Sequence, residues 1–410
     1  MVINRFLFII ITSFASMLMT FWVYFKILGI AKQKNLVDNP DARKLQKQPV
    51  PVLGGIAVFF GVICATLLAC SLANCGKVLP IILAMSMMLY VGAIDDLVEL
   101  SPRNRIIIEV LAVTGLIFGD GACINSLHGL WGIEAFSWWI GVPLTIFAGV
   151  GIINAMNMID GVNGLSSGLC ITFSVFFGIA MFKSRDYPNA MLAFVFAAAL
   201  IPFLVHNVLG KTSKMFIGDA GTMTMGILMT WFVIQMLRED HNYRWAEYVF
   251  HQHLSLVALT LAILAVPVGD TLRVMTLRII KGRSPFKPDK THLHHMLLNY
   301  SGSHSLTSLM EIGIAFLIVL IWLITYLFRL SQELQFYIVL LAGALLVWGT
   351  YAYLSFQDKR NSNTAYHIRR HLSKMRQGDK EWWARLQHFI DTPREPKKGH
   401  FDADEEEGRN

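Results

Sequence analysis

The sequence predicts an all-α integral membrane protein with about eleven transmembrane helices. Of its 410 residues, 54% are hydrophobic and 15% are charged, and the mean hydropathy is +0.51. This balance is typical of a membrane protein rather than of two or three soluble domains. Apolar runs of about 18 residues or more match a hydrocarbon core about 30 Å thick. The runs are continuous rather than alternating, so we expect helices and not a closed barrel.

Eleven apolar segments are candidates for these helices. The first, 6–25, carries no charge and lacks a small-x-small cleavage site, so we interpret it as a retained span and not a signal peptide. The fourth, 105–120, is short and contains Glu109, although Arg105 can pair with it on one helix face; a helix end near the interface is the alternative. The candidate spans are 6–25, 52–73, 78–94, 105–120, 137–154, 165–182, 189–208, 218–237, 254–271, 307–328 and 336–355.

The distribution of positive charge predicts the orientation in the membrane. Under this map, 28 of the 35 Lys and Arg residues fall on one side, which is the side of the carboxyl-terminal tail. Positive residues in loops collect on the cytoplasmic side. We therefore expect an amino terminus outside, a membrane domain over 1–355 with cytoplasmic active-site loops, and a cytoplasmic tail over 356–410. Within the tail, 367–390 predicts a basic amphipathic helix on the inner leaflet, followed by an acidic disordered end.

Four polar motifs fall on the predicted cytoplasmic face. The pair Asp95 and Asp96 in "AIDDL" ends the third span, "NAMNMIDGVNGL" ends the fifth, "FIGDAG" with Asp219 opens the eighth, and "THLHH" lies between the ninth and tenth. Acids at a membrane edge are functional candidates by default. Because the motifs share one face, we expect them to form one site, and this agreement also supports the fourth span.

The fifth-span motif places four polar residues three positions apart: Asn154, Asn157, Asp160 and Asn163. In a continuous helix each step of three lags a full turn by about 60°, so the first and last would face opposite ways. Gly161 and Gly164 favour a helix that ends near Asp160. The stretch is therefore predicted to present its polar groups from a helix end and the following turn.

The acids and amides predict a divalent cation site. Asp95, Asp96, Asp160 and Asp219, with the carbonyl oxygens of Asn154 and Asn157, are hard oxygen ligands suited to Mg²⁺, with Mn²⁺ as an alternative. Structural explanations remain open at this point. The Asp95–Asp96 pair can cap a helix or pair with Arg103 and Arg105, and Asp219 can be the N-cap of the eighth helix.

A basic segment supplies the opposite charge. The stretch 273–295 combines six positive residues with three histidines: Arg273, Arg278, Lys281, Arg283, Lys287, Lys290, His292, His294 and His295. Positive-inside bias alone can explain the basic residues. Three histidines within four positions have poor geometry for one zinc ion, and they suit phosphate oxygens better.

Together these groups favour phosphoryl transfer between a cytosolic diphosphate and a lipid acceptor at the membrane edge, with a metal neutralising charge. The rival class is an ion-coupled transporter, which predicts polar residues near the bilayer midplane and repeated spans. Here the acids gather at one face, and neither "AIDDL" nor "FIGDAG" is repeated.

The motifs resemble those of the polyprenyl-phosphate N-acetylhexosamine-1-phosphate transferases of glycosyltransferase family 4. The resemblance rests on "VPVLGG", "AIDDL", "NAMNMIDGVNGL", "FIGDAGT" and "PVGDTLRVMTLRIIKGRSPFKPDKTHLHH", in this order and over roughly 5–355. The "SPFKPDKTHLHH" form is similar to the bacterial branch that transfers GlcNAc-1-phosphate from UDP-GlcNAc to undecaprenyl phosphate. Another UDP-N-acetylhexosamine or UDP-MurNAc-pentapeptide stays open as donor, and the glycan started is of the O-antigen, enterobacterial common antigen or teichoic-acid type.

This resemblance implies roles for particular residues. Asp219, assisted by Asn157, is expected to bind Mg²⁺, and Asp95 or Asp96, with Asp160, is expected to do the catalytic work on the lipid phosphate. The expected nucleotide-binding residues are Phe216, which is similar in position to an aromatic that stacks on uracil, and Asp160, Asn163, Asn154 and Asn207. The expected diphosphate and sugar ligands are His292, His294, His295, Arg283, Arg273, Lys47 and Lys44.

One residue departs from the bacterial pattern, and several properties follow from the resemblance alone. Asn163 stands where many bacterial members have aspartate; an amide can bond a uracil edge but cannot act as a base. We favour a single displacement over a phospho-enzyme. The resemblance implies the bacterial inner membrane, an active site facing the cytoplasm, and membrane lipids as partners; we expect no nucleic-acid partner and leave a homodimer open.

Overall fold

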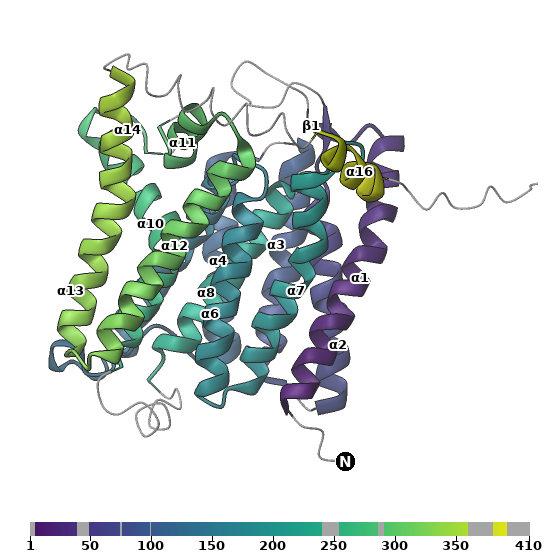
Figure 1. Ribbon diagram of the computed structural model, residues 1–410. Helices are drawn as coiled ribbons and strands as arrows, with labels where there is room; N and C mark the ends of the chain where they lie inside the picture. The colour runs from purple at the N-terminus through teal and green to yellow at the C-terminus, as the bar shows by residue number, and fades with distance from the viewer. Residues whose placement is uncertain are drawn as a thin grey trace, which may run out of the picture.

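The computed structural model is a bundle of long helices that lie roughly side by side (Figure 1). It describes residues 5–38, 49–73, 76–98, 100–239, 254–285, 291–359 and 380–391. Within these residues the only strands are β1 (Val37–Asp38) and β2 (Val50–Pro51), which pair antiparallel. The predicted all-α membrane fold is confirmed.

The helices follow the predicted apolar segments closely. They are α1 (Arg5–Gln33), α2 (Gly54–Ala73), α3 (Leu79–Val98), α4 (Pro102–Asp120), α5 (Trp138–Met158), α6 (Leu165–Lys183), α7 (Tyr187–Leu209), α8 (Gly218–Leu237), α10 (Leu256–Ile280), α11 (Leu293–Ser301), α12 (His304–Leu327), α13 (Gln332–Gly343), α14 (Thr350–Lys359) and α16 (Lys380–Asp391). Short helical turns are η1 (Gly76–Val78), η2 (Leu130–Gly132) and η3 (Ala344–Gly349), the last of which joins α13 to α14. Among the described residues, ten helical segments are long and apolar enough to cross a membrane, and α13, η3 and α14 form one of them.

Of the predicted spans, only the fourth, α4, is not among these ten apolar segments. It carries charge, and Arg105 Nε donates to Glu109 Oε1 at 3.2 Å, which confirms the pairing expected at this spacing. At 1.5 Å per residue its 19 residues still extend about 28 Å. Because Asp96 near the end of α3 and Asn157 near the end of α5 line one pocket, α4 must return the chain to the far end of the bundle. The eleven expected spans are therefore ten apolar helices and α4.

The central helix of the bundle is α8, whose residues Ala220 to Leu237 are all buried. Small residues let its neighbours approach closely. A Cβ added at Gly92 of α3 would lie 2.5 Å from Ala220 Cα, and one added at Gly226 of α8 would lie 2.5 Å from Ile153 Cα of α5. The carboxyl ends of α3 and α5 therefore converge on the N-terminus of α8.

Of the predicted tail 356–410, the structure describes the end of α14, up to Lys359, and α16. The helix α16 falls within the predicted amphipathic segment 367–390 and extends it by one residue, and it lies beside the end of α1 that also carries β1 (Figure 1). The remainder of 360–410, including the predicted acidic end, lies outside the described residues.

Candidate active site

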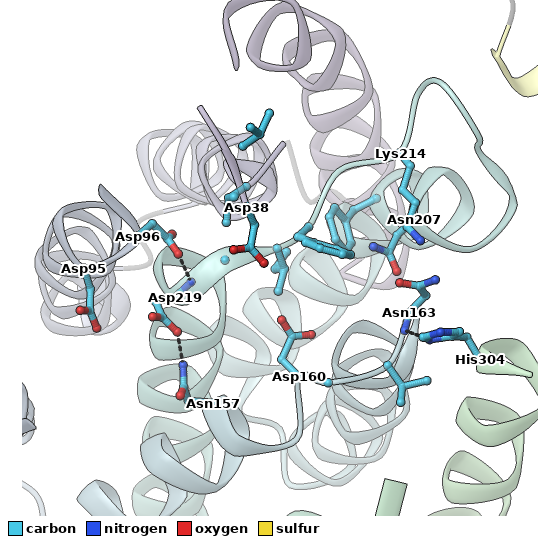
Figure 2. Close-up of a pocket in the computed structure, with 18 of the residues that line it drawn as sticks. Asp38, Asp95, Asp96, Asn157, Asp160, Asn163, Asn207, Lys214, Asp219 and His304 are labelled. Atoms are coloured by element: carbon cyan, nitrogen blue, oxygen red, sulfur yellow. Dashed lines mark hydrogen bonds between the residues drawn. The ribbon is translucent and has the colours of Figure 1, made fainter. Parts of the chain in front are cut away.

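A pocket of about 490 Å³ opens at the end of the bundle where α8 begins (Figure 2). Its wall combines β1, the ends of α3 and α5, the loop before α8 and the start of α12. The lining residues are Val37, Asp38, Val52, Asp95, Asp96, Asn157, Asp160, Gly161, Val162, Asn163, Phe203, Asn207, Lys214, Phe216, Ile217, Gly218, Asp219, His295 and His304. All four polar motifs of the sequence thus contribute to one space.

The motif "NAMNMIDGVNGL" leaves the helix at the predicted place. The helix α5 ends just before Asp160, and Gly164 precedes α6 with φ +78°. Two other helices hold the turn: Gly164 N donates to Asn207 Oδ1 at 2.7 Å, and Ser308 Oγ donates to the carbonyl oxygen of Asn163 at 2.8 Å. Packing against α7 and α12 therefore keeps Asp160 and Asn163 on the pocket wall.

Asp219 lies near the centre of the site, at the start of α8. Asn157 Nδ2 donates to Asp219 Oδ1 at 2.5 Å and to Thr222 Oγ1 at 2.7 Å. Among the described residues, no hydrogen bond engages the side-chain oxygen Oδ1 of Asn157 or Asp219 Oδ2. Asp38, Asp160 and Asp219 face one another across the pocket (Figure 2). Hard oxygen donors in this arrangement fit a small divalent cation that shares its shell with a phosphate.

Asp96 uses both carboxylate oxygens to cap α8. The backbone N–H of Asp219 donates to Asp96 Oδ1 at 2.7 Å, and that of Ala220 donates to Asp96 Oδ2 at 3.1 Å. Gly218 has φ +72°, and a Cβ added there would lie 2.4 Å from Asp96 Oδ2. Asp96 therefore sets the direction of the first turn of α8, and with it the position of Asp219.

Asp95 is held in the connection between α3 and α4. The backbone N–H of Leu100 donates to its Oδ1 at 2.6 Å, and Arg105 Nη1 lies 3.6 Å from its Oδ2. In Figure 2 it lies to one side of the other pocket carboxylates. The capping and pairing roles left open for the Asp95–Asp96 pair are thus present in the structure.

Asp160 and Lys214 are the two ionisable pocket groups whose surroundings perturb them most clearly outside the membrane spans. Burial, with a smaller effect of Asp219, raises the pKa of Asp160 to about 6, although Ser166 Oγ donates to its Oδ1 at 2.6 Å. Burial also lowers the pKa of Lys214, whose Nζ lies 5.6 Å from the ring centroid of Phe216. A carboxyl with this pKa is matched to accept a proton near neutral pH.

The rings of the three histidines lie close together, but only one of them lines the pocket. His292 precedes α11, and among the pocket-lining residues only His295 comes from this motif. His294 is 1% exposed, and a Cβ added at Gly161 would lie 2.5 Å from its Nε2. Burial, together with the charges of its two histidine neighbours, holds the pKa of His294 well below its usual value, so this imidazole is neutral. The predicted contact with phosphate fits His295 best.

A second cluster of potential metal ligands lies behind the pocket. Asp270, His292 and His294 each offer one ligand atom, and these atoms lie within 4.8 Å of one another. Both Asp270 oxygens are engaged, however, by Arg273 Nη2 at 2.6 Å, the backbone N–H of Leu293 at 3.1 Å and His292 Nδ1 at 2.8 Å. A guanidinium so close opposes a further cation. The cluster is better explained as hydrogen-bonded support for the histidine segment.

Two predicted ligands are engaged elsewhere, which corrects the expectation for them. Asn154 does not line the pocket, because its Nδ2 donates to Glu109 Oε2 at 2.5 Å. Arg273 bonds Asp270 and lies 3.5 Å from the ring centroid of Tyr351. Neither residue lines the pocket, and Arg273 is held inside the bundle although its Nε and Nη1 have no hydrogen-bond partner among the described residues.

Of the other predicted ligands, two line the pocket, one lies outside it, and two lie outside the described residues. Phe216 and Asn207 line the pocket, but the Asn207 amide also donates to the carbonyl oxygen of Met215 at 2.9 Å and so supports the wall. Arg283 is exposed and is not among the lining residues. Lys44 and Lys47 lie outside the described residues.

Sequence reasoning missed three polar pocket residues: Asp38, Lys214 and His304. Asp38 lies within the first basic loop, and pairing of β1 with β2 brings it to the pocket. Lys214 lies two positions before Phe216, in a loop where positive-inside bias alone explains a basic residue. His304 Nδ1 accepts a hydrogen bond from the backbone N–H of Asn163 at 3.4 Å. Their sequence signal was weak because their place depends on contacts between distant segments.

Comparisons with known proteins agree with this architecture. A model described as glycosyl transferase family 4 matches residues 78–237. An undecaprenyl-phosphate alpha-N-acetylglucosaminyl 1-phosphate transferase of Yersinia pestis is 29% identical, covering 86% of this chain and 92% of the relative. A protein of the same name from Escherichia coli strain K12 is 30% identical, covering 66% and 71%. A decaprenyl-phosphate N-acetylglucosaminephosphotransferase of Mycolicibacterium smegmatis is 32% identical, covering 72% and 74%.

The helical bundle, the acidic pocket at its end and these relatives define a multi-span membrane transferase. The chain belongs to glycosyl transferase family 4.

Proposed function

We propose that this protein transfers N-acetylglucosamine 1-phosphate from UDP-N-acetylglucosamine to undecaprenyl phosphate and releases UMP. The acceptor and the transferred group follow the names of the Yersinia pestis and Escherichia coli relatives, and the UDP-linked donor follows the resemblance of the sequence motifs. The observation that carries the proposal is the arrangement of Asp219, Asn157 and Asp160 with Lys214 and Phe216 around one pocket. This set supplies oxygen donors, a positive charge and an aromatic face, which are the groups that a nucleotide diphosphate requires.

In this proposal Asp219 Oδ2 and the side-chain oxygen of Asn157 would hold Mg²⁺, or Mn²⁺ in its place. The metal supplies neutralisation of the diphosphate charge. Lys214 adds positive charge to the wall, and Lys214 and His295 both offer nitrogen atoms that can donate hydrogen bonds. The donor set fits this ion because both residues line the pocket, and because neither Asp219 Oδ2 nor Asn157 Oδ1 is engaged by a hydrogen bond among the described residues.

The chemical step is written as a single displacement. An oxygen of the lipid phosphate attacks the β-phosphorus, the bond from that phosphorus to the bridging oxygen breaks, and UMP leaves with the bridging oxygen. Asp160 takes any remaining proton from the lipid phosphate, because its pKa of about 6 is close to the second pKa of a phosphate monoester. Asp96 is assigned to positioning, since both its oxygens accept backbone hydrogen bonds.

The nucleoside is placed at the other side of the pocket. Phe216 offers a ring face to uracil, and Asn163 offers an amide to the edge of the base. In this proposal the pocket lies on the cytoplasmic side of a bacterial inner membrane. The excess of Lys and Arg in the loops at that end of the bundle agrees with this orientation. The product would start an envelope glycan of one of the three types named above.

The decisive assay measures UMP release by the purified full-length protein with undecaprenyl phosphate and Mg²⁺. UDP-N-acetylglucosamine should be the preferred donor over other UDP-N-acetylhexosamines and UDP-MurNAc-pentapeptide. EDTA should stop release, and added Mg²⁺ or Mn²⁺ should restore it. The absence of turnover with every UDP-sugar would refute the proposal.

The metal assignment has its own variant. Asp219→Asn should lower turnover at least about 100-fold while the melting temperature stays near that of the wild type. Glu134→Gln is the matched control, because it neutralises an exposed carboxylate far from the pocket-lining residues. Near-normal turnover by Asp219→Asn would exclude this residue as the principal ligand.

A further inference from the structure

The last residue of α16 makes an unusual set of contacts with the loop between α7 and α8. The carboxylate of Asp391 accepts hydrogen bonds from the backbone N–H groups of Lys211 at 3.0 Å, Thr212 at 3.1 Å and Ser213 at 3.0 Å. Ser213 Oγ donates to the same carboxylate at 2.8 Å. Three consecutive amides and a hydroxyl therefore converge on one anion from a segment about 180 residues away in sequence.

Contacts between α1 and the carbonyl groups of this loop hold it in the conformation that binds Asp391. Tyr24 Oη donates to the carbonyl oxygen of Ser213 at 2.8 Å, and Lys32 Nζ donates to that of Thr212 at 2.7 Å. Since α1 engages the carbonyl groups, the N–H groups are directed away from it. Gly210 is required at the start, because a Cβ there would lie 2.5 Å from Ser213 Oγ. Successive N–H groups arranged in this way form an anion-binding nest.

The nest continues directly into the pocket wall. Lys214 follows Ser213, which is only 4% exposed, and both Lys214 and Phe216 line the pocket. The loop is thus tied down by α1 and by the tail just before the residues proposed to bind the nucleotide. Loss of the Asp391 contact would free the N–H side of this loop.

We propose that Lys211, Thr212 and Ser213 form a binding site for a carboxylate or phosphate, that Asp391 is its resident ligand, and that α16 docked there positions the adjacent Lys214. Binding of Asp391 to this loop would then control the shape of the pocket wall. Its effect on the donor rests on the proposed function, whereas binding of the anion does not.

The charge state of Asp391 agrees with this docking. Burial alone would raise its pKa, but hydrogen bonds from Ser213, Lys211 and Thr212 outweigh burial and hold the pKa below its usual value. The carboxylate is therefore ionised throughout the neutral range, and attachment needs no proton.

Hydrogen exchange of the full-length protein tests the site without any substrate. In the wild type the amides of 211–213 should be protected, and Asp391→Ala should make them exchange at least about tenfold faster. Acetate at tens of millimolar should restore protection in that variant, as should inorganic phosphate, whereas chloride at equal ionic strength should not. Glu381→Gln, which removes a carboxylate from the first turn of the same helix, should leave exchange unchanged. Unprotected amides in the wild type, or no response to Asp391→Ala, would overturn the site.

Kinetics tests the positioning role. Asp391→Ala should raise KM for UDP-N-acetylglucosamine several-fold with kcat within about twofold, and acetate should reverse the change; Asp391→Glu should recover part of the affinity. If exchange responds but KM does not, the control of the pocket is refuted and the anion site stands. If the wild type turns over no UDP-sugar, only the proposed function fails, because the exchange result is independent of it.

Discussion

Replacing Asp96 by alanine should lower the stability of the protein as well as its turnover. The carboxylate accepts hydrogen bonds from the backbone N–H groups of Asp219 and Ala220 at 2.7 and 3.1 Å. A hydrogen bond to a charged group contributes about 1.5–3 kcal/mol, and the loss of a helix cap costs about 0.5–2 kcal/mol. Because these amides face the pocket, water can replace part of the interaction. We therefore expect a loss of about 2–3 kcal/mol.

Thermal unfolding in detergent and UMP release, measured on the same preparations, separate a capping role from a proton-accepting one. Asp96→Ala should melt several degrees below the wild type and lose most turnover, because Asp219 is displaced. Asp96→Asn should melt at an intermediate temperature, since its amide oxygen accepts one N–H while its NH₂ group meets the other. Two variants that melt like the wild type but are equally inactive would refute the capping interpretation and restore Asp96 as a base.

Two further predictions concern the pocket wall. Burial raises the pKa of Asp160 from 3.8 to about 6, so between pH 3.8 and about pH 6 the folded state binds more protons than the unfolded state. The free energy of unfolding of the wild type therefore falls by about 3 kcal/mol as the pH rises through this range. In metal-free buffer the melting temperature of Asp160→Asn relative to wild type should therefore rise from pH 4.5 to pH 7; a constant difference would contradict the pKa. Phe216→Leu should raise KM for the UDP-sugar about five- to tenfold with little change in kcat, as expected for a lost stacking face. Phe147→Leu, at a side chain 78% exposed on α5, is its control, and equal KM values for the two variants would exclude stacking.

Much of the fold could be predicted because the constraints on a membrane helix are local. A run of apolar residues must satisfy its own backbone, so its length and composition reveal the span. The end of α5 before Asp160 and the pairing of Arg105 with Glu109 were also predictable, since glycine placement and i,i+4 spacing act within a few residues. Even α4, the least apolar span, followed from the requirement that the acidic motifs share one face.

The use of individual side chains could not be read in the same way. Asn154 and Asn157 belong to one motif, yet one bonds Glu109 inside the bundle and the other bonds Asp219 in the pocket. Asp38 reaches the pocket through strand pairing that has no clear local signature. Whether a polar side chain lines the pocket or only stabilises the bundle depends on which neighbouring helix it contacts.

The sequence by itself determined that this chain is a multi-span membrane protein with acidic, amide and basic motifs gathered at one end, because hydropathy and charge act over short distances along the chain. Only the tertiary structure decided that Asp96 caps α8, that Arg273 is bound by Asp270, and that Asp391 occupies the loop next to Lys214. These contacts join residues whose hydrogen-bonding capacity is fixed by type, but whose partners are selected by the close packing of helices around α8.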